Sequence, residues 1–422
     1  RKTLSPPRPP GHDARDLWKQ AGEAGVLKGL KVVELATYIA APGAGGIMAD
    51  WGADVVKIEP PRGDPMRRFF DGITVGEYGN PVFELDNRGK RGVVFDTSTA
   101  DGREAALRLI AGADVFLTNV RPGALKRSGM DWETLHAAFP RLVYCSLTGY
   151  GLQGPDADRA GMDVAAFWSR SGVGALTAPK GVEPFPIRTA MGDHITSLAT
   201  VSAILAAVYE RNGTGVGRLV ETSLLRTGVY SIGSDMAIQL RFGKLASTRP
   251  RHQAVQPLAN FFKTSDDRWI CLLVRTGDTD WPQIAAAVGH PELVEDPRFA
   301  TGRARRQNTE ALVTIMDAAF AAMTYEEAAA RLDAEDVTWA PYQMPRDLVD
   351  DPQAEAAGCF VDTPDGQGGA RRAPAGPARF EGYDDGPKGP APDLGQHTGQ
   401  VLAELGYGAA EIAALKASGA VA

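Results

Sequence analysis

Lys31-Val-Val-Glu-Leu35 is a short run rich in β-branched residues, and a second such run, Asp54-Val-Val-Lys-Ile-Glu59, follows it. The small-residue segment from Ala40 to Trp51 lies between them. The two runs have the length and composition of strands, and the segment between them has the length of a helix. Pro60-Pro61 ends the second run, because proline cannot donate to a β-ladder. This order predicts two parallel strands joined by a helix.

The same alternation continues along the chain. Strands are expected over residues 91–96, 114–119 and 142–147, and helices over about 101–111 and 131–139. Short apolar runs that alternate with helical segments are typical of a parallel sheet covered by helices on both faces. The fold class predicted for residues 27–215 is therefore α/β, a Rossmann-like large domain.

At about 150 residues per domain, 422 residues predict two or three domains, or one large α/β unit that carries an insertion. We expect a flexible N-terminal extension over 1–26, a linker over 216–251 and a smaller α+β domain over 252–345. Residues 346–422 are expected to form a linker and a C-terminal return to the large domain.

Composition excludes several classes of protein. Lys and Arg number 45 against 52 Asp and Glu, so the net charge is −7, which disfavours binding to nucleic acid or to an anionic membrane. The longest apolar stretch, Ser197 to Tyr209, is shorter than the roughly 20 residues that span a bilayer, and the N-terminus has no signal-peptide core. The three cysteines and six histidines have neither disulfide nor metal-site spacing. We expect a cytoplasmic protein without a metal.

The first strand-to-helix turn allows two interpretations. Gly43 and Gly45 begin a dinucleotide fingerprint, but Met48 stands where its third glycine belongs. Glu59 stands where a dehydrogenase has its ribose-binding acid. The glycines therefore either let a cofactor approach or merely allow close packing of the helix. Cationic side chains follow several of the expected strands, so they would gather at the carboxyl edge of the sheet. Such a cluster favours an anionic ligand, for example a phosphorylated nucleotide, although each cation by itself could be an ordinary surface charge.

Asp193, in Ala190-Met-Gly-Asp-His194, precedes a long helix of small residues. It is either a plain N-cap or an ionised nucleophile held at a helix start, beside N–H groups able to stabilise an oxyanion. Asp163 lies in a loop with Gly161 and is either a turn residue or a second acid. The histidines have no serine or cysteine partner that the sequence identifies, so no hydrolase triad is predicted.

Several motifs together resemble the family III CoA-transferases, the CaiB/BaiF group of formyl-CoA transferase, carnitine CoA-transferase and α-methylacyl-CoA racemase. They are Leu30-Lys-Val-Val-Glu-Leu, Trp51-Gly-Ala-Asp-Val-Val-Lys-Ile-Glu-Pro-Pro, Asn87-Arg-Gly-Lys-Arg, Asn119-Val-Arg-Pro-Gly-Ala-Leu, Ser146-Leu-Thr-Gly-Tyr-Gly with Gly154-Pro155, and Met191-Gly-Asp193. The resemblance runs from about residue 27 into the small domain, and more loosely to the end.

The resemblance implies an interlocked homodimer in which Asp193 is the covalent nucleophile. CoA, as a substrate and not a tightly bound cofactor, would contact strand-end residues: Ile39, Ala40, Phe95, Ser98, Asn119, Val120, Arg121, Arg127 and Arg159. Pro60 stands where formyl-CoA transferase has an arginine, so a phosphate contact is expected from Arg67 or Arg68 instead. Ile39 replaces a glutamine of that enzyme, which argues against its particular acid substrate.

Gly161-Met162-Asp163 stands where the racemases of this group carry Gly-His-Asp. Racemisation needs two groups that exchange a proton with the α-carbon, and Met162 cannot carry one. We therefore expect a CoA-transferase that moves CoA between an acyl-CoA and a carboxylic acid through an aspartyl intermediate. The alternatives are an acyl-CoA racemase or isomerase, a nicotinamide-dependent oxidoreductase and a non-catalytic acyl-CoA-binding protein. The loop His252 to Pro257 borders the expected cleft, without an assigned role.

Overall fold

The computed structural model describes residues 25–69, 71, 79–185, 187–188, 190–275 and 278–422. The chain forms two compact units. Unit 1 runs to Gly174 and also contains Pro186–Arg241 and Gly358–Ala422, and unit 2 contains Ala175–Phe185 and Phe242–Ala357. All but the last two residues of the extension expected over 1–26 lie outside the described residues.

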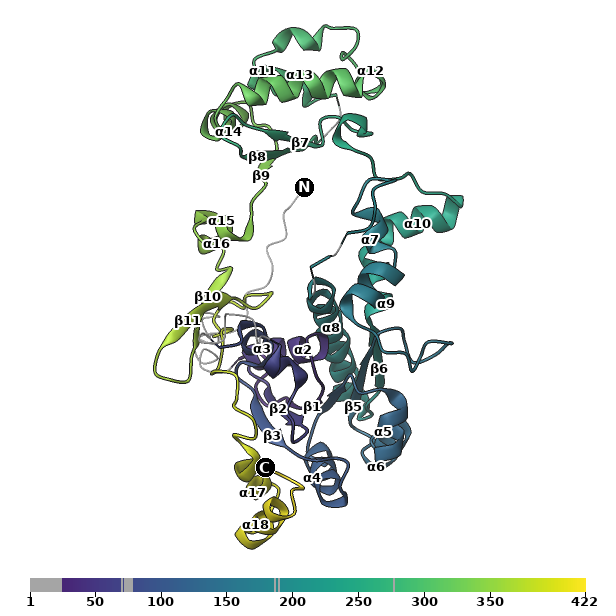
Figure 1. Ribbon diagram of the computed structural model, residues 1–422, viewed down its shortest axis with the longest axis vertical. Helices are drawn as coiled ribbons and strands as arrows, with labels where there is room; N and C mark the ends of the chain where they lie inside the picture. The colour runs from purple at the N-terminus through teal and green to yellow at the C-terminus, as the bar shows by residue number, and fades with distance from the viewer. Residues whose placement is uncertain (1–24, 70, 72–78, 186, 189, 276–277) are drawn as a thin grey trace, which may run out of the picture. The chain divides into compact units, whose positions relative to one another are not determined.

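Unit 1 is built on a six-stranded sheet in which every pair of neighbouring strands is parallel (Figure 1). The order is β3-β2-β1-β4-β5-β6, the doubly wound order of dinucleotide-binding folds. Its strands are β1 (Lys31–Leu35), β2 (Asp54–Glu59), β3 (Arg91–Val94), β4 (Val115–Thr118), β5 (Val143–Thr148) and β6 (Leu219–Ser223). The prediction of an α/β fold with a parallel sheet is confirmed. β6 falls in the segment that the sequence analysis assigns to a linker.

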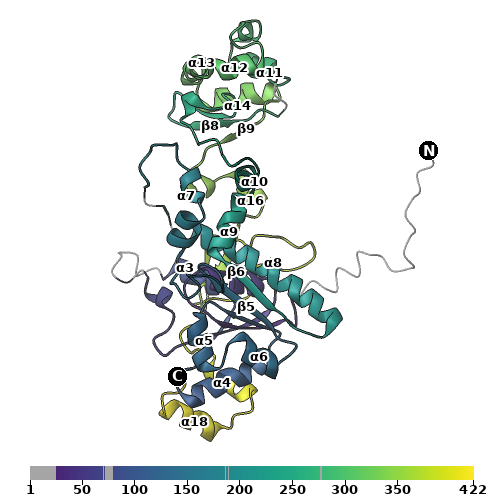
Figure 2. The same cartoon turned by 90° about the vertical axis from the view of Figure 1, so that its right-hand side faces the viewer.

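Helices cover both faces of this sheet (Figures 1 and 2). Neighbouring residues of one strand point to opposite faces, so Val32 packs in one apolar cluster with α2 and α8, and Val33 packs in another with α4 and α17. The helices of the first face are α2 (Ala40–Asp50) and α8 (Met191–Thr214), and those of the second are α4 (Ala100–Ala111), α5 (Pro122–Ser128), α6 (Trp132–Ala138), α17 (Thr398–Glu404) and α18 (Ala409–Ala417).

The end of the chain lies against the edge of this sheet. The backbone N–H of Gly92 donates to His397 Nδ1 at 3.1 Å, and that of Val94 donates to Thr398 Oγ1 at 3.0 Å. Phe95 forms a β-bridge with Val421. The remaining elements of unit 1 include η1 (Pro65–Arg68), α3 (Pro81–Asn87), the π-helix η3 (Val164–Arg170), α9 (Leu224–Ser231), and the antiparallel hairpin β10 (Phe360–Pro364) and β11 (Ala370–Pro374).

The long helix α8 has 24 residues and is apolar enough, by length and composition, to cross a membrane. The expectation that the longest apolar segment is too short for this is therefore wrong. The helix packs on α2, β5 and β6, and it buries Val201, Ile204 and Arg211 there. Arg211 pairs with Asp114 at 2.8 Å. These contacts make α8 a core helix of unit 1.

Unit 2 contains an antiparallel sheet covered by helices around its own apolar core. Phe262 stacks on Phe320 there at a ring-centroid distance of 5.0 Å, and Trp281 is buried beside them. The strands are β7 (Asn260–Lys263), β8 (Trp269–Leu272) and β9 (Trp339–Pro341). The helices are η4 (Arg251–Gln253), α11 (Trp281–Ala287), η5 (Pro291–Val294), α12 (Gly302–Gln307), α13 (Thr309–Ala321), α14 (Tyr325–Ala334), α15 (Pro345–Leu348) and α16 (Pro352–Ala356). Two helices extend across the boundaries between the units, α7 (Val173–Leu176) and α10 (Gly233–Phe242).

Candidate active site

Asp193 is the third residue of α8. The helix begins at Met191 and its N-cap is Ala190, so the alternative that Asp193 is the N-cap is wrong. Ala190 has a φ of 79°, in the left-handed region that residues with a Cβ avoid. Strain of this kind persists where the surrounding structure imposes it, and functional sites are common places for it. The carboxylate therefore lies inside the first helical turn, at the positive end of the helix dipole.

The packing of α8 on α2 shows which face of the helix carries Asp193. Ser197, one turn further along α8, donates from its Oγ to the Ala40 carbonyl at 2.7 Å. Residues four apart share a helix face, and helical side chains lean toward the N-terminus. Asp193 therefore shares the α8 face that meets the start of α2, the helix that follows the turn after β1. This turn belongs to the carboxyl edge of the sheet, where doubly wound folds bind ligands.

The glycines after β1 lie within α2 and serve close packing. A Cβ at Gly43 would come within 2.7 Å of Ser197 Oγ, one at Gly45 within 2.1 Å of Glu34 Oε2, and one at Gly46 within 2.8 Å of the Asp86 carbonyl. The interpretation that these glycines let a cofactor approach is wrong, because protein atoms occupy that space. Glu59 is fully buried and binds both Arg67 and the Asp64 N–H, so it does not serve as a ribose-binding acid.

A buried ionic network fixes the turn between β1 and α2. Lys57 Nζ lies 3.0 Å from Glu34 Oε1 and 2.9 Å from Asp64 Oδ2, and it also donates to the Ala36 carbonyl. Asp64 Oδ1 accepts from the N–H of Tyr38, which has a φ of 65°. Burial lowers the pKa of Lys57, but Glu34, Asp64 and Glu59 outweigh it and the net pKa is raised. The charges thus hold a strained turn in place beside Asp193.

Lys90 completes this network from β3's amino side. Its Nζ lies 2.7 Å from Glu34 Oε2 and donates to the Pro42 carbonyl at 2.8 Å. Burial lowers the pKa of Lys90 to about 8, against the opposing charge of Glu34. Lys90 therefore connects the first turn of α2 to the buried ionic network.

Asp163 lies directly against the first turn of α8. Its exposed fraction is 4%, and a Cβ built on Gly192 would fall 2.2 Å from Asp163 Oδ1 and 2.3 Å from the Phe167 ring. The loop that carries Asp163 is fixed by a second close approach, because a Cβ on Gly161 would lie 2.4 Å from the Cα of Gly149. Only glycine at 192 leaves room for both the carboxylate and the ring.

The charges around Asp193 make it an unusually basic carboxylate. Burial raises its pKa to about 7, and the negative charges of Asp163 and Asp86 act in the same direction. His194 opposes them, and its Nε2 lies 3.0 Å from Asp86 Oδ1. The hydrogen bond to Asp86 raises the pKa of His194. A carboxylate with this pKa is still substantially ionised at neutral pH and is more nucleophilic than an ordinary aspartate.

A cavity of about 460 Å³ opens at the carboxyl ends of β1, β2, β3 and β4. Among the residues expected to bind CoA, four line this cavity: Phe95, Ser98, Val120 and Arg127. Thr97 lines it as well and lies within the expected stretch from Phe95 to Ser98, whereas Thr37 and Arg103 also line it and were not predicted from the sequence. Arg103 lies in the first turn of α4, after β3, so the rule that cations follow strand ends could have identified it.

The other expected CoA residues do not line this cavity. Asn119 is committed to the turn: its Oδ1 accepts from the Thr37 N–H at 3.0 Å and its Nδ2 donates to the Thr37 carbonyl at 2.7 Å. Ile39 and Ala40 lie at the start of α2, Arg121 at the N-cap of α5, and Arg159 pairs with Asp156 at 3.3 Å.

The substitute phosphate contact expected from Arg67 is not free to form. Its guanidinium makes a double contact with Glu59, at 2.7 and 2.6 Å, and donates to the Pro392 carbonyl. The neighbouring Arg68 is exposed. Arg103 and Arg127 are thus the cations that the structure places at the cavity.

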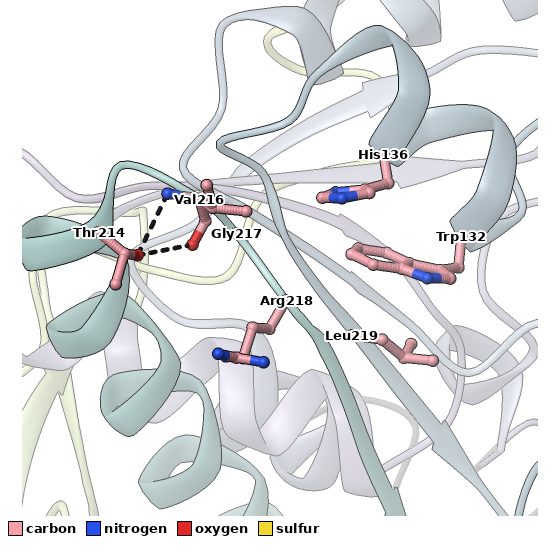
Figure 3. A pocket seen from close by; sticks show the side chains of 7 residues that line it. All are labelled: Trp132, His136, Thr214, Val216, Gly217, Arg218 and Leu219. Atoms are coloured by element: carbon pink, nitrogen blue, oxygen red, sulfur yellow. Dashed lines mark hydrogen bonds between the residues drawn. The ribbon is translucent and has the colours of Figure 1, made fainter.

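Two of the histidines lie in other regions of the chain. A hollow of about 550 Å³ lies at the amino end of β6, the opposite edge of the sheet, where Trp132 stacks on His136 at 4.2 Å (Figure 3). In unit 2, His252 of the His252–Pro257 loop lies 3.4 Å from Asp317. Within the described residues, no group of three His, Cys, Asp or Glu side chains could hold a metal ion.

Comparison with known proteins gives a consistent result. A model described as CoA-transferase family III matches residues 27–398. The chain is 33% identical to (R)-2-hydroxy-4-methylpentanoate CoA-transferase of Clostridioides difficile, over 90% of this chain and 96% of that protein. It is 31% identical to cinnamoyl-CoA:phenyllactate CoA-transferase of Clostridium sporogenes, over 93% and 96%. A crystal structure of a CAIB/BAIF family protein from Brucella suis matches with a TM-score of 0.80 and 33% identity, over 90% of this chain and all of that chain.

Proposed function

The chain belongs to CoA-transferase family III and transfers CoA between an acyl-CoA and a carboxylic acid, and we propose that Asp193 is the nucleophile of that reaction. The observation that carries the proposal is the half-buried Asp193 carboxylate in the first turn of α8, with a pKa raised to about 7 by burial and by its acidic neighbours. It is supported by the α8 face that Asp193 shares with Ser197, which meets the start of α2 at the same carboxyl edge of the sheet where the cavity with Arg103 and Arg127 opens.

The first half of the reaction forms a CoA thioester on the enzyme. One Asp193 oxygen attacks the thioester carbonyl, the carbon–sulfur bond breaks, and a mixed anhydride and CoA thiolate result. The thiolate then attacks the Asp193 carbonyl carbon, and the donor acid leaves with the bridging oxygen. No proton is gained or lost in these steps, so no general acid is required.

The second half runs the same steps in reverse with the acceptor acid. The acceptor carboxylate attacks the Asp193 thioester, thiolate is released, and thiolate then attacks the acceptor carbonyl of the new anhydride. The product is the acceptor's CoA thioester, and Asp193 is again a carboxylate. Backbone N–H groups at the start of α8 are suited to stabilise the oxyanions of these steps.

The acceptor is proposed to be a monocarboxylic acid with an apolar side chain. Met162 and Met191, next to Asp163 and near Asp193 in the chain, are each 53% exposed. Two relatives are named for 2-hydroxy-4-methylpentanoate and phenyllactate, acids of this kind. A panel of these acids with succinate and glutarate, analysed by mass spectrometry of the CoA products, tests this. Preference for the dicarboxylic acids would contradict it.

Arg127 and Arg103 are proposed to bind the phosphates of CoA. Arg127→Ala and Arg103→Ala are each expected to raise the KM for acyl-CoA about tenfold, the loss of a charge-assisted contact, with little change in kcat. Lys126→Ala is the matched control, because Lys126 is an exposed cation next to Arg127 that does not line the cavity. Steady-state kinetics measure both constants. An equal rise in KM for Lys126→Ala and Arg127→Ala would contradict a specific contact with CoA, because it would show that only the overall positive charge of this region affects binding.

The protein is proposed to act as an interlocked homodimer. Tyr209, Tyr230 and Leu240 are each at least 80% exposed, and α10 has no buried residue in a single chain. Apolar surface of this extent is characteristic of an interface. Sedimentation equilibrium is expected to give twice the chain mass, and Tyr230→Glu with Leu240→Glu is expected to lower it. A monomer in the unsubstituted protein would contradict the proposal.

A further inference from the structure

Asp163 is a buried acid that the reaction steps above do not use. Among the described residues, neither of its carboxylate oxygens has a partner that meets full hydrogen-bond geometry, and the same is true of Nε1 of Trp168. Burial raises the pKa of Asp163, and the Trp168 N–H and three backbone N–H groups oppose this effect. Leaving a buried carboxylate unpaired is costly, so its retention calls for a physical reason.

The position of Asp163 couples it to the nucleophile. Its Oδ1 lies 2.2 Å from the place where a Cβ on Gly192 would stand, and Gly192 is the residue before Asp193 in the first turn of α8. Burial raises the pKa of Asp163, and the backbone N–H groups of Ala190, Asp193 and Gly192 and the side chain of Trp168 lower it. They offset part of its burial cost, whereas for Asp193 only His194 opposes burial. More groups therefore favour the ionised form of Asp163 than favour that of Asp193.

We propose that Asp163 is a positioning residue that activates Asp193: its buried charge destabilises the free Asp193 carboxylate, and this destabilisation is released whenever Asp193 is acylated. The inference rests on the proposed role of Asp193 as nucleophile.

The change in charge during the reaction explains how Asp163 would favour the acylated enzyme. When Asp193 becomes an anhydride or a thioester, its negative charge leaves with the thiolate and then with the donor acid. The repulsion between Asp163 and Asp193 then disappears. A fixed negative charge beside the nucleophile therefore shifts the internal equilibrium toward the acylated enzyme, without contact between Asp163 and the substrate.

The test compares Asp163→Asn with the unsubstituted protein. In the latter, kcat/KM is expected to fall with pH below about 7, because protonated Asp193 cannot attack. The charges of Asp163, Asp86 and His194 all shift the pKa of Asp193, and Asp163→Asn removes only the charge of Asp163. The acid limb should then move to lower pH by about one unit, the size of a like-charge effect.

The second measurement is the ratio of Asp193–CoA adduct to free enzyme, obtained by intact mass over a series of acyl-CoA to free acid ratios. Asp163→Asn should lower the equilibrium constant for adduct formation roughly tenfold, the factor that corresponds to one pKa unit. The KM for acyl-CoA should not change. Asp101→Asn, which removes an exposed charge on α4, is the control and should leave both measurements unaltered. Asp163→Ser provides a second neutral variant if the asparagine variant does not fold.

The possible results separate the two proposals. An adduct in the unsubstituted protein, with an unchanged acid limb and equilibrium constant in a folded Asp163 variant, would overturn the role of Asp163 and leave that of Asp193 intact. The complete absence of an adduct in the unsubstituted protein, despite turnover, would instead overturn the nucleophile.

Discussion

Asp193→Asn is expected to lower the rate of CoA transfer by a factor on the order of 10³ or more, because an amide oxygen cannot form the anhydride. The change preserves the shape of the side chain in the first turn of α8. CoA should therefore bind as before, since Asp193 does not line the cavity that contains Arg103 and Arg127, the cations of the proposed CoA site. Stopped assays with acyl-CoA and free acid measure the rate, and calorimetry measures the binding of CoA.

The same variant should be more stable than the unsubstituted protein at neutral pH. The pKa of Asp193 is about 7 in the folded protein and 3.8 without its surroundings, so the folded state loses stability as pH rises through this window. Asparagine removes that loss, which we expect to be roughly 1 to 3 kcal/mol above pH 7 and to vanish near pH 4. Urea unfolding at several pH values measures it. Full transfer activity in a folded Asp193→Asn variant would remove the nucleophile assignment.

Gly192→Ala is expected to have the second largest effect. The added Cβ would lie 2.2 Å from Asp163 Oδ1 and 2.3 Å from the Phe167 ring, and both neighbours are buried. Relief requires movement of η3, the Asp163 loop or the first turn of α8. We expect a loss of about 2 to 4 kcal/mol in the free energy of unfolding. Transfer should fall by a factor on the order of 10², because a displacement of about 1 Å spoils the attack geometry.

Gly213→Ala is the matched control in the same helix. A Cβ at Gly213 meets nothing within 4 Å, so the helix-forming preference of alanine should raise stability by up to about 1 kcal/mol. Thermal unfolding and kinetics of both variants give the comparison. Equal stability and activity of the two variants would contradict the close packing at Gly192.

The sequence predicted most of the large sheet because its central strands are continuous apolar runs. Val32, Val33, Val55 and Val56 are buried on the two faces, as a parallel sheet covered on both sides requires. β6 was harder to identify, because it is an edge strand. It alternates buried Val220 and Thr222 with exposed residues, a pattern that also suits a linking segment.

The candidate site was only partly predictable. Asp193 was identified by its position before a helix of small residues, but the helix begins at Met191, after the left-handed Ala190, three residues earlier than the sequence indicates. The partners in the buried network are far apart in sequence, as for Glu34 and Lys90, and charges in strands usually indicate exposure. Sequence periodicity contains no information about such tertiary pairs. The same holds for the contact between Asp163 and Gly192.

The most direct test of the account follows oxygen atoms through the reaction. In the second half-reaction, the bond broken by thiolate lies between the acceptor carbonyl carbon and the bridging oxygen, so an acceptor oxygen remains on Asp193. After turnover with ¹⁸O-labelled acceptor acid, the peptide that contains Asp193 is predicted to carry the label in that side chain. Rapid turnover with no label at Asp193 would contradict the covalent mechanism.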